Sequence, residues 1–289
     1  MSDSVWAIAI HGGSGPSYKN DYAKEESSMR KILDSARKDL KKGAKALDVV
    51  QEAVAELEDS GQHIAGRGSC PNAKGKWELD AAIMDGSNRR AGAVGALQGY
   101  KNPIECARTV MTDSPHILMV GKGAEKFLKK RGLKTISNPN GYYKPMVTQK
   151  SYDSVPHGTV GAVALDSEGH LAAATSTGGL TNKPPGRISD SAVIGSGTWA
   201  DERVAVSCTG QGEYFMRVNA ASDVSARIRY TRSDLANATA CVLEEISLLG
   251  GQGGLIAIDR LGRVAMPFNT IIMKRGFATW RDDFDVKVF

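Results

Sequence analysis

The sequence lacks the cysteine and histidine spacings that hold metal ions or support redox chemistry. Its four cysteines, Cys70, Cys106, Cys208 and Cys241, form no C-x-x-C pair, which argues against structural zinc and thioredoxin-like chemistry. The five histidines are scattered and form neither H-E-x-x-H nor H-x-x-x-H, so a transition-metal site is also disfavoured. We therefore expect free thiols in a reducing compartment.

Nucleotide-binding and serine-hydrolase motifs are missing as well, although the chain contains 32 glycines. There is no G-x-x-x-x-G-K-[ST], and the segment GQGEYF that begins at Gly210 lacks the third glycine of a dinucleotide fingerprint. There is also no G-x-S-x-G, which disfavours a hydrolase built on a serine nucleophile elbow.

Long apolar runs are absent, and the longest, such as VWAIAI, are too short to cross a membrane. The first residues contain neither a basic segment nor an apolar stretch of signal-peptide length, so we expect a cytoplasmic protein without a membrane partner. The net charge is only +5. Basic clusters at residues 37–45 and 126–134 lack the interleaved aromatics of a surface that binds single-stranded nucleic acid, and they are interpreted as solvated helix faces.

The patterns that are present predict an α/β fold. At 289 residues, with 41% hydrophobic and 24% charged residues, the chain can form one large α/β domain or two small ones. Apolar runs predict a strand over 5–15 that ends in a glycine turn, further strands before a turn at 85–86, at 91–97 and at 203–210, and hairpins over 159–176 and 253–269. Amphipathic patterns predict helices over 21–41, 44–57, 103–112, 121–132 and 235–249. We expect antiparallel sheets packed together, helices outside, and one core spanning a loose segment at 137–158.

Three threonines lie beside glycines at predicted strand ends: Thr159 in HGTVG, Thr177 in TSTGG and Thr209 in SCTGQG. A single strand-end threonine is usually structural, because threonine suits strands and caps loops. Three of them, with Gly158 and Thr159 joined behind a loose segment, favour a catalytic interpretation.

A threonine hydroxyl becomes a useful nucleophile when a base lies beside it, and a free α-amine on the same residue is such a base. That amine has a reference pKa of about 7.7–8.0, close to working pH. It exists only if the bond between Gly158 and Thr159 is cut, and Gly158 leaves that bond sterically accessible.

A charged pair lies in the segment PPGRISDS, where Arg187 precedes Asp190 by three residues. A guanidinium pairs with a carboxylate in a bidentate fashion, and a carboxylate pairs with an ammonium, so the two side chains match the ends of a free amino acid. The alternative is an ordinary ion pair on a surface loop.

Together these segments resemble the plant-type L-asparaginases and isoaspartyl peptidases of the N-terminal-nucleophile hydrolases. The motifs are HGGSG, LED…AGRGS, ELDAAIMDG, GAVGAL, NPIECAR, GTVGAVALD, ATSTGG, GRISDS, TGQGE and PFNT, in the expected order over nearly the whole chain. The resemblance implies a four-layer αββα sandwich that forms a single domain. It also implies self-cleavage between Gly158 and Thr159 into chains of residues 1–158 and 159–289.

The resemblance also implies the roles of individual residues. Thr159 would be the nucleophile, Thr177 would orient it, and Thr209 Oγ with the Gly210 N–H would form the oxyanion hole. Arg187 would hold the α-carboxylate of the substrate, while Asp190 and the Gly212 carbonyl would hold its α-ammonium. The implied substrates are asparagine and β-aspartyl dipeptides.

Further expectations follow from the same resemblance. Catalysis would need no cofactor, and a structural sodium ion would bind backbone carbonyls of one loop. Those carbonyls belong to Leu57, Glu58, Ser60, His63, Ala65 and Arg67. The assembly would be a homodimer of cleaved pairs, with no nucleic-acid partner.

Two segments depart from the family pattern. Ile64 occupies a position where the family usually has asparagine, close to the nucleophile, and NTIIMKRG near the C-terminus replaces a stretch resembling NTEGMYRG. Two alternatives therefore stay open. One is a glycosylasparaginase, although that group more often has HDT and TSTNG at the corresponding positions and is commonly secreted. The other is a catalytically silent, uncleaved homologue, which Ile64 alone favours.

Overall fold

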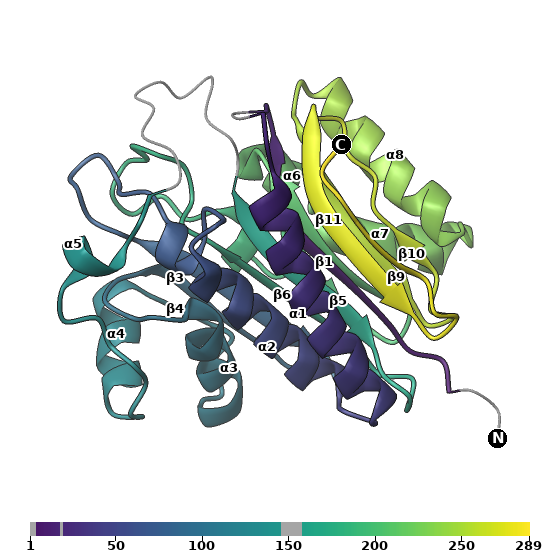
Figure 1. The fold of residues 1–289 in the computed structure, drawn as a ribbon, viewed down its shortest axis with the longest axis horizontal. Helices are drawn as coiled ribbons and strands as arrows, with labels where there is room; N and C mark the ends of the chain where they lie inside the picture. Colours follow the sequence, from purple (N-terminus) through teal and green to yellow (C-terminus); the bar gives the residue numbers. More distant parts are fainter. Residues whose placement is uncertain (1–3, 18–19, 146–157) are drawn as a thin grey trace.

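The computed structural model describes residues 4–17, 20–145 and 158–289, and these contain two β-sheets with helices packed against them (Figure 1). The larger sheet has eight strands in the order β12-β11-β1-β5-β6-β2-β3-β4. Its strands are β1 (Ala7–Gly15), β2 (Leu79–Asp85), β3 (Ala91–Leu97), β4 (Leu118–Val120), β5 (Thr159–Leu165), β6 (Leu171–Thr177), β11 (Ile272–Thr279) and β12 (Phe284–Lys287).

The smaller sheet has four strands in the order β10-β9-β8-β7. They are β7 (Thr198–Ala200), β8 (Val204–Gly210), β9 (Gly253–Asp259) and β10 (Val264–Ala265). The two predicted hairpins therefore belong to different sheets: β5 and β6 pair in the larger one, and β9 and β10 in the smaller one.

The helices fall into two groups along the chain. The first comprises α1 (Ala23–Lys41), α2 (Ala46–Ser60), α3 (Pro103–Asp113), α4 (Gly121–Lys129) and the short α5 (Pro139–Tyr142). The second comprises α6 (Gly212–Val218), α7 (Ala220–Thr231) and α8 (Leu235–Leu248), and short 3₁₀ turns occur at Gly66–Gly68 and Asp190–Ala192. The sequence patterns missed α6, α7, β4, β7, β11 and β12. The predicted loose segment contains α5, and its residues 146–157 lie outside the described structure.

Alternation along the strands explains how the layers pack. On β1, Ile8 and Ile10 lie in a core cluster with side chains of α1, α2 and α3, whereas Ala7 and Ala9 lie in a second cluster with strands of the smaller sheet. A third cluster joins the outer face of the smaller sheet to α6, α7 and α8. Because both faces of each sheet are covered, the strands are apolar on both sides rather than alternately polar.

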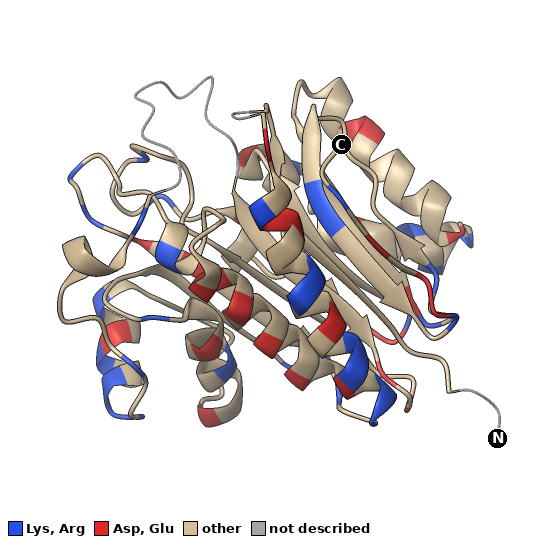
Figure 2. Ribbon diagram, in the orientation of Figure 1, with Lys and Arg blue, Asp and Glu red and all other residues tan. Residues whose placement is uncertain are grey.

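Charged residues gather on helices and turns, and most of the strand surface carries none (Figure 2). The basic cluster at residues 37–45 covers the end of α1, where Lys38 is exposed and pairs with Asp34. No helix among the described residues combines the length and apolar character needed to cross a bilayer.

Two sequence predictions about the strands were wrong in detail. The sheets are not wholly antiparallel, because β4 runs parallel to β3; α3 lies between them in the chain, and such a helical crossover returns the chain in the same direction. In addition, the glycines of β1 do not form the predicted turn. They lie within the strand, which runs to Gly15 through an irregularity between His11 and Ser14, where Gly13 has a φ of 102°.

The two sheets lie close together where Gly161 of β5 faces Ser207 of β8. A β-carbon at position 161 would overlap Ser207 Oγ and His11 Nε2. Glycine is therefore required by the space between the layers rather than by a turn.

We predict that Gly161→Ala destabilises the fold by about 1–3 kcal/mol, because overpacking a fixed interior forces neighbouring atoms apart. Urea unfolding would measure this loss. The matched control is Gly123→Ala on α4, where a β-carbon meets no atom within 4 Å, and where we expect no destabilisation. Equal stabilities for the two variants would contradict the packing argument.

Candidate active site

Thr159 and Thr177 are direct cross-strand partners at the start of β5 and the end of β6. Both are buried, with 5% and 1% of their surfaces exposed. The Thr177 hydroxyl donates to the Gly158 carbonyl at 3.2 Å and accepts from Gly179 N at 2.9 Å. The Thr177 side chain therefore contacts the carbonyl of the Gly158–Thr159 peptide bond, which is the bond predicted to be cleaved.

Thr209 belongs to the smaller sheet and, like Thr159 and Thr177, lies at the end of a strand. It is near the end of β8, two residues beyond Ser207, and its carbonyl accepts from Ser14 Oγ of β1 at 3.1 Å. The Thr209 hydroxyl is buried and has no hydrogen-bond partner within the described part of the chain. The neighbouring Gly210, the last residue of β8, has a φ of 149°, and a β-carbon there would lie 2.5 Å from the Gln252 carbonyl, so close backbone packing requires glycine at this position.

The charged residues predicted to bind substrate gather where α6 begins. Arg187 does not pair with Asp190; its Nε and Nη2 donate to Glu213 Oε1 at 3.0 and 2.7 Å. Asp190 and Arg187 both lie against Gly212, where a β-carbon would be 2.5 Å from Asp190 Oδ1 and 3.3 Å from Arg187 Nη2. The sequence prediction missed Glu213, because Arg187 and Glu213 are 26 positions apart and no local pattern indicates that they pair.

Asp190 is a buried carboxyl group with an altered acidity. Burial raises its pKa to about 7, the nearby Arg187 works against this shift, and Glu213 adds to it. Its Oδ2 atom is buried and makes no hydrogen bond to the described residues. A cationic donor placed there would restore the charged form, because an adjacent positive charge stabilises a carboxylate.

A chain of buried side chains connects Thr159 to the smaller sheet. His11 Nδ1 lies 3.1 Å from the Thr159 carbonyl and must donate to it, which leaves Nε2 to accept from Ser207 Oγ at 2.9 Å. Ser207 then accepts from Thr175 Oγ1 at 2.7 Å, and Thr175 accepts from Thr198 Oγ1 at 2.7 Å. Every hydrogen bond of this chain is donated in the direction of the Thr159 carbonyl, so each bond polarises the next.

His11 is held neutral by this arrangement. Burial lowers its pKa to about 3, an effect that Lys274 reinforces and the hydrogen bond to the Thr159 carbonyl opposes. Its neutral form is the one that can donate at Nδ1 and accept at Nε2 together.

Ile64 lies beside Gly158. The resemblance to the family implied such a position, close to the predicted nucleophile. Ile64 is 4% exposed, and a β-carbon at position 158 would overlap its side chain. Its carbonyl accepts from Gly178 N at 2.8 Å. Any side chain at position 158 would therefore clash with Ile64, so only glycine fits there.

Glu58 is a second buried carboxyl group, behind the strand that carries Thr177. It accepts from Ser176 Oγ at 2.6 Å and from Ile104 N at 3.1 Å, and burial raises its pKa to about 8. The two neighbours of Ser176 on β6, Thr175 and Thr177, point to the other face of the sheet.

The loop predicted to hold sodium has features that fit a carbonyl-lined site. A β-carbon at Gly66 would lie 2.6 Å from the Glu58 carbonyl oxygen, and one at Gly68 would overlap the His63 carbonyl. Glycine thus keeps space open beside two of the predicted ligands. The carbonyls of Leu57, Ala65 and Arg67 already accept from Ser60 Oγ, Gly68 N and Lys144 N. The described residues contain no metal-binding group of His, Cys, Asp or Glu side chains, so a cation here would depend on backbone oxygens.

Comparison with known proteins agrees with the motifs. A family model described as asparaginase matches residues 4–144 and 137–288. An isoaspartyl peptidase of Escherichia coli (strain K12) is 42% identical over 294 aligned residues, which cover 93% of this chain and 92% of that protein. A plant-type L-asparaginase of Pyrococcus horikoshii is 36% identical over 292 aligned residues, covering 91% of this chain and 93% of that protein. The resemblance inferred from the sequence is confirmed.

The neutral state of His11 predicts how stability depends on pH. The unfolded chain takes up a proton on this imidazole below a pKa of 6.5, whereas the folded protein resists protonation down to about 3. Its contribution to stability is therefore full above pH 6.5 and falls with acid by about 1.4 kcal/mol per pH unit.

We expect His11→Asn, which keeps a donor for the Thr159 carbonyl but leaves Ser207 without its acceptor, to be less stable at pH 7.5 by about 1–3 kcal/mol. The gap between wild type and variant should narrow as the pH falls from 6.5 to 4.5. Urea unfolding at several pH values measures this gap, and a gap that stays constant would mean that folded His11 is already protonated.

Proposed function

The chain belongs to the asparaginase family, and we propose that it is an amidohydrolase that cleaves itself before Thr159 and then hydrolyses L-asparagine and β-aspartyl dipeptides. The observation that carries this proposal is the contact of the Thr177 hydroxyl with the Gly158 carbonyl, opposite Thr159. The packing of helices, larger sheet, smaller sheet and helices supports assigning the fold as the four-layer αββα sandwich of N-terminal-nucleophile hydrolases, formed by the chain as a single domain.

Self-cleavage would begin at the buried junction. Thr159 Oγ adds to the Gly158 carbonyl carbon while the Thr177 hydroxyl donates to the carbonyl oxygen, where negative charge develops. The bond from this carbon to Thr159 N then breaks, the nitrogen takes the hydroxyl proton, and an ester joins the two residues. One water molecule hydrolyses the ester, leaving a carboxylate on Gly158 and a free amine on Thr159.

The amine would then serve as the base for hydrolysis of substrate. Thr159 Oγ attacks the side-chain amide carbon, and its proton passes by way of the amine to the leaving nitrogen. Thr209 Oγ1, buried and without a partner in the described structure, is available to donate to the tetrahedral oxyanion together with the Gly210 N–H. Water hydrolyses the resulting ester, and aspartate leaves.

Substrate recognition would use the charged cluster at α6. The α-carboxylate of the substrate would compete with Glu213 for Arg187, whose Nε and Nη2 both donate to one oxygen of the Glu213 carboxylate. The α-ammonium binds Asp190 beside Gly212 and lowers the raised pKa of that carboxyl group. These contacts would select substrates whose aspartyl part has a free α-carboxylate and a free α-ammonium. They would not discriminate between different leaving amines.

Other parts of the proposal rest on the family. A sodium ion would be held by the loop carbonyls beside Gly66 and Gly68, and the proposed chemistry uses only groups of this chain. We propose a homodimer of cleaved pairs in the cytoplasm. The four cysteines are free thiols, three of them buried, which supports a reducing environment. Relatives named isoaspartyl peptidase favour this activity over that of a glycosylasparaginase.

Cleavage is tested directly by replacing the nucleophile. We predict that Thr159→Ala remains one uncut chain without amidase activity, whereas Thr159→Ser still cuts, because it keeps both a hydroxyl and an amine. Denaturing electrophoresis, N-terminal sequencing and ammonia release from asparagine measure these outcomes. A smaller fragment that begins at any residue other than 159 would refute the assignment.

A second test concerns Ile64, which packs on Gly158 but can donate no hydrogen bond. An amide there could hold the threonine backbone or amine, an interaction worth about 0.5–3 kcal/mol, or roughly a 2- to 150-fold change in rate. We predict an active but slow wild-type enzyme that Ile64→Asn accelerates in cleavage, turnover or both. Time courses of both reactions decide the matter. Unchanged rates, or a variant that does not fold, would make Ile64 simply a packed core residue.

A further inference from the structure

The segment that follows β6 contains Arg187 and leads to Asp190, the first residue of the turn at Asp190–Ala192, and from residue 178 to 189 it contains no helix or strand. We call residues 178–190 the recognition loop. Without a helix or strand, its shape must be fixed by contacts to the rest of the fold. Two of its backbone N–H groups are held by carboxylates: Gly186 N donates to Glu78 Oε2 at 3.0 Å, and Ser189 N donates to Asp80 Oδ2 at 2.9 Å. These two contacts flank Arg187.

Asp80 is the more constrained of the two carboxylates. It is fully buried, and it is the β2 partner of Thr177 in the sheet. Its Oδ1 atom accepts from Ala96 N at 2.9 Å, at a register break between β2 and β3, so both carboxylate oxygens are engaged. One side chain thus joins the strand paired with Thr177 to the loop that carries Arg187.

A buried lysine supports the same arrangement. Lys183 has no exposed surface, and its Nζ donates to the Glu78 carbonyl at 2.7 Å. A β-carbon at Gly179, which donates to Thr177 Oγ1, would lie 2.7 Å from this Nζ. The ammonium therefore lies beneath the start of the recognition loop, where it offsets the buried charges of Asp80 and Glu78.

We propose that Asp80 is a positioning residue for substrate binding, which holds Arg187 and Asp190 in register with the nucleophile, with Glu78 and Lys183 as its support. This inference rests on the proposed function, because it assumes that Arg187 and Asp190 bind the two charged ends of an amino acid. A bidentate carboxylate contact tolerates little displacement of the guanidinium, so loosening the loop weakens binding more than it weakens chemistry.

The test is Asp80→Asn, which preserves size but can accept with only one of its two terminal atoms. We expect KM for asparagine to rise about tenfold or more while kcat stays within about threefold, because ground-state and transition-state contacts to the substrate ends are lost equally. Self-cleavage should persist. Glu78→Gln should have a smaller effect, because its loop contact uses one oxygen, which an amide can supply.

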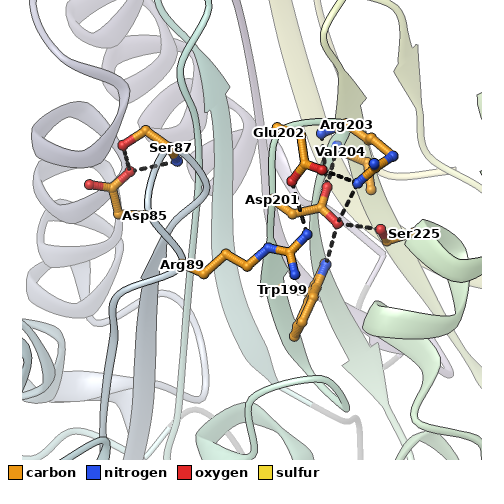
Figure 3. Close-up of polar contacts among 9 residues, drawn as sticks. All are labelled: Asp85, Ser87, Arg89, Trp199, Asp201, Glu202, Arg203, Val204 and Ser225. Carbon is orange, nitrogen blue, oxygen red and sulfur yellow. Dashed lines mark hydrogen bonds and ion pairs between the residues drawn. The ribbon is translucent and has the colours of Figure 1, made fainter. Parts of the chain in front are cut away.

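The matched control is Asp201→Asn. Asp201 is also a buried carboxylate that organises a turn, since it accepts from Arg203 N at 2.8 Å, Val204 N at 3.1 Å, Trp199 Nε1 at 3.2 Å and Ser225 Oγ (Figure 3). It lies at the end of β8 opposite to Thr209. This variant should lose stability but keep its KM, which separates loop positioning from general structural damage.

The outcomes separate this inference from the proposed function. If wild type hydrolyses asparagine and Asp80→Asn shows an unchanged KM, a fall in kcat alone or no self-cleavage, the positioning role is refuted while the function stands. If wild type hydrolyses neither substrate, the function fails, and calorimetric titration with L-aspartate decides the inference. Binding about tenfold weaker in Asp80→Asn would support it; equal binding, or none to wild type, would overturn it.

Discussion

The close approach of β5 to β8 is the constraint on which the site depends. Because residue 161 has no side chain, the Ser207 hydroxyl can lie between His11 and Thr175, and the sheets are joined there by hydrogen bonds instead of apolar contact. Thr159 precedes Gly161 by two residues, and Thr209 follows Ser207 by two. The contact of Gly161 with Ser207 therefore also brings the start of β5 and the end of β8 to the same end of the two sheets. There, Ser14 of β1 donates a hydrogen bond to the Thr209 carbonyl.

Satisfied and unsatisfied polar groups have different parts in this arrangement. The chain from Thr198 to the Thr159 carbonyl is buried, but each of its donors meets an acceptor, so it holds the strands in place without an unpaired group. Thr209 Oγ1 and Asp190 Oδ2 are buried with no partner among the described residues. Several other buried polar atoms of the described residues also lack a partner, and these two are the ones for which the proposed mechanism supplies an oxyanion and an ammonium.

Sequence patterns predicted much of this fold and part of the site. Local periodicity identified the two hairpins, most helices and the threonines at strand ends, because those signals lie within a few residues of one another. It could not predict that β4 runs parallel to β3, or that Asp80 is hydrogen-bonded to Ser189, 109 positions away in the chain. Nor could it foresee that Arg187 pairs with Glu213. Such contacts depend on which strand ends and loops lie close together in the folded chain, and a local sequence pattern cannot predict that.

The proposed mechanism gives Gly158 a part that goes beyond accessibility. In the uncut chain its carbonyl accepts from Thr177 Oγ1 and its backbone passes Ile64 with no room for a side chain. The first amide that the threonine meets is therefore the protein's own. In that mechanism, breaking the bond turns the Gly158 carbonyl into part of a carboxylate that is no longer joined to Thr159, and it turns the Thr159 amide nitrogen into a basic amine. One event would therefore create the base and release the group that the Thr177 hydroxyl held. Cleavage and substrate hydrolysis then share a single geometry, and a residue that holds Thr177 in place acts on both reactions, whereas one that holds the recognition loop acts only on the second.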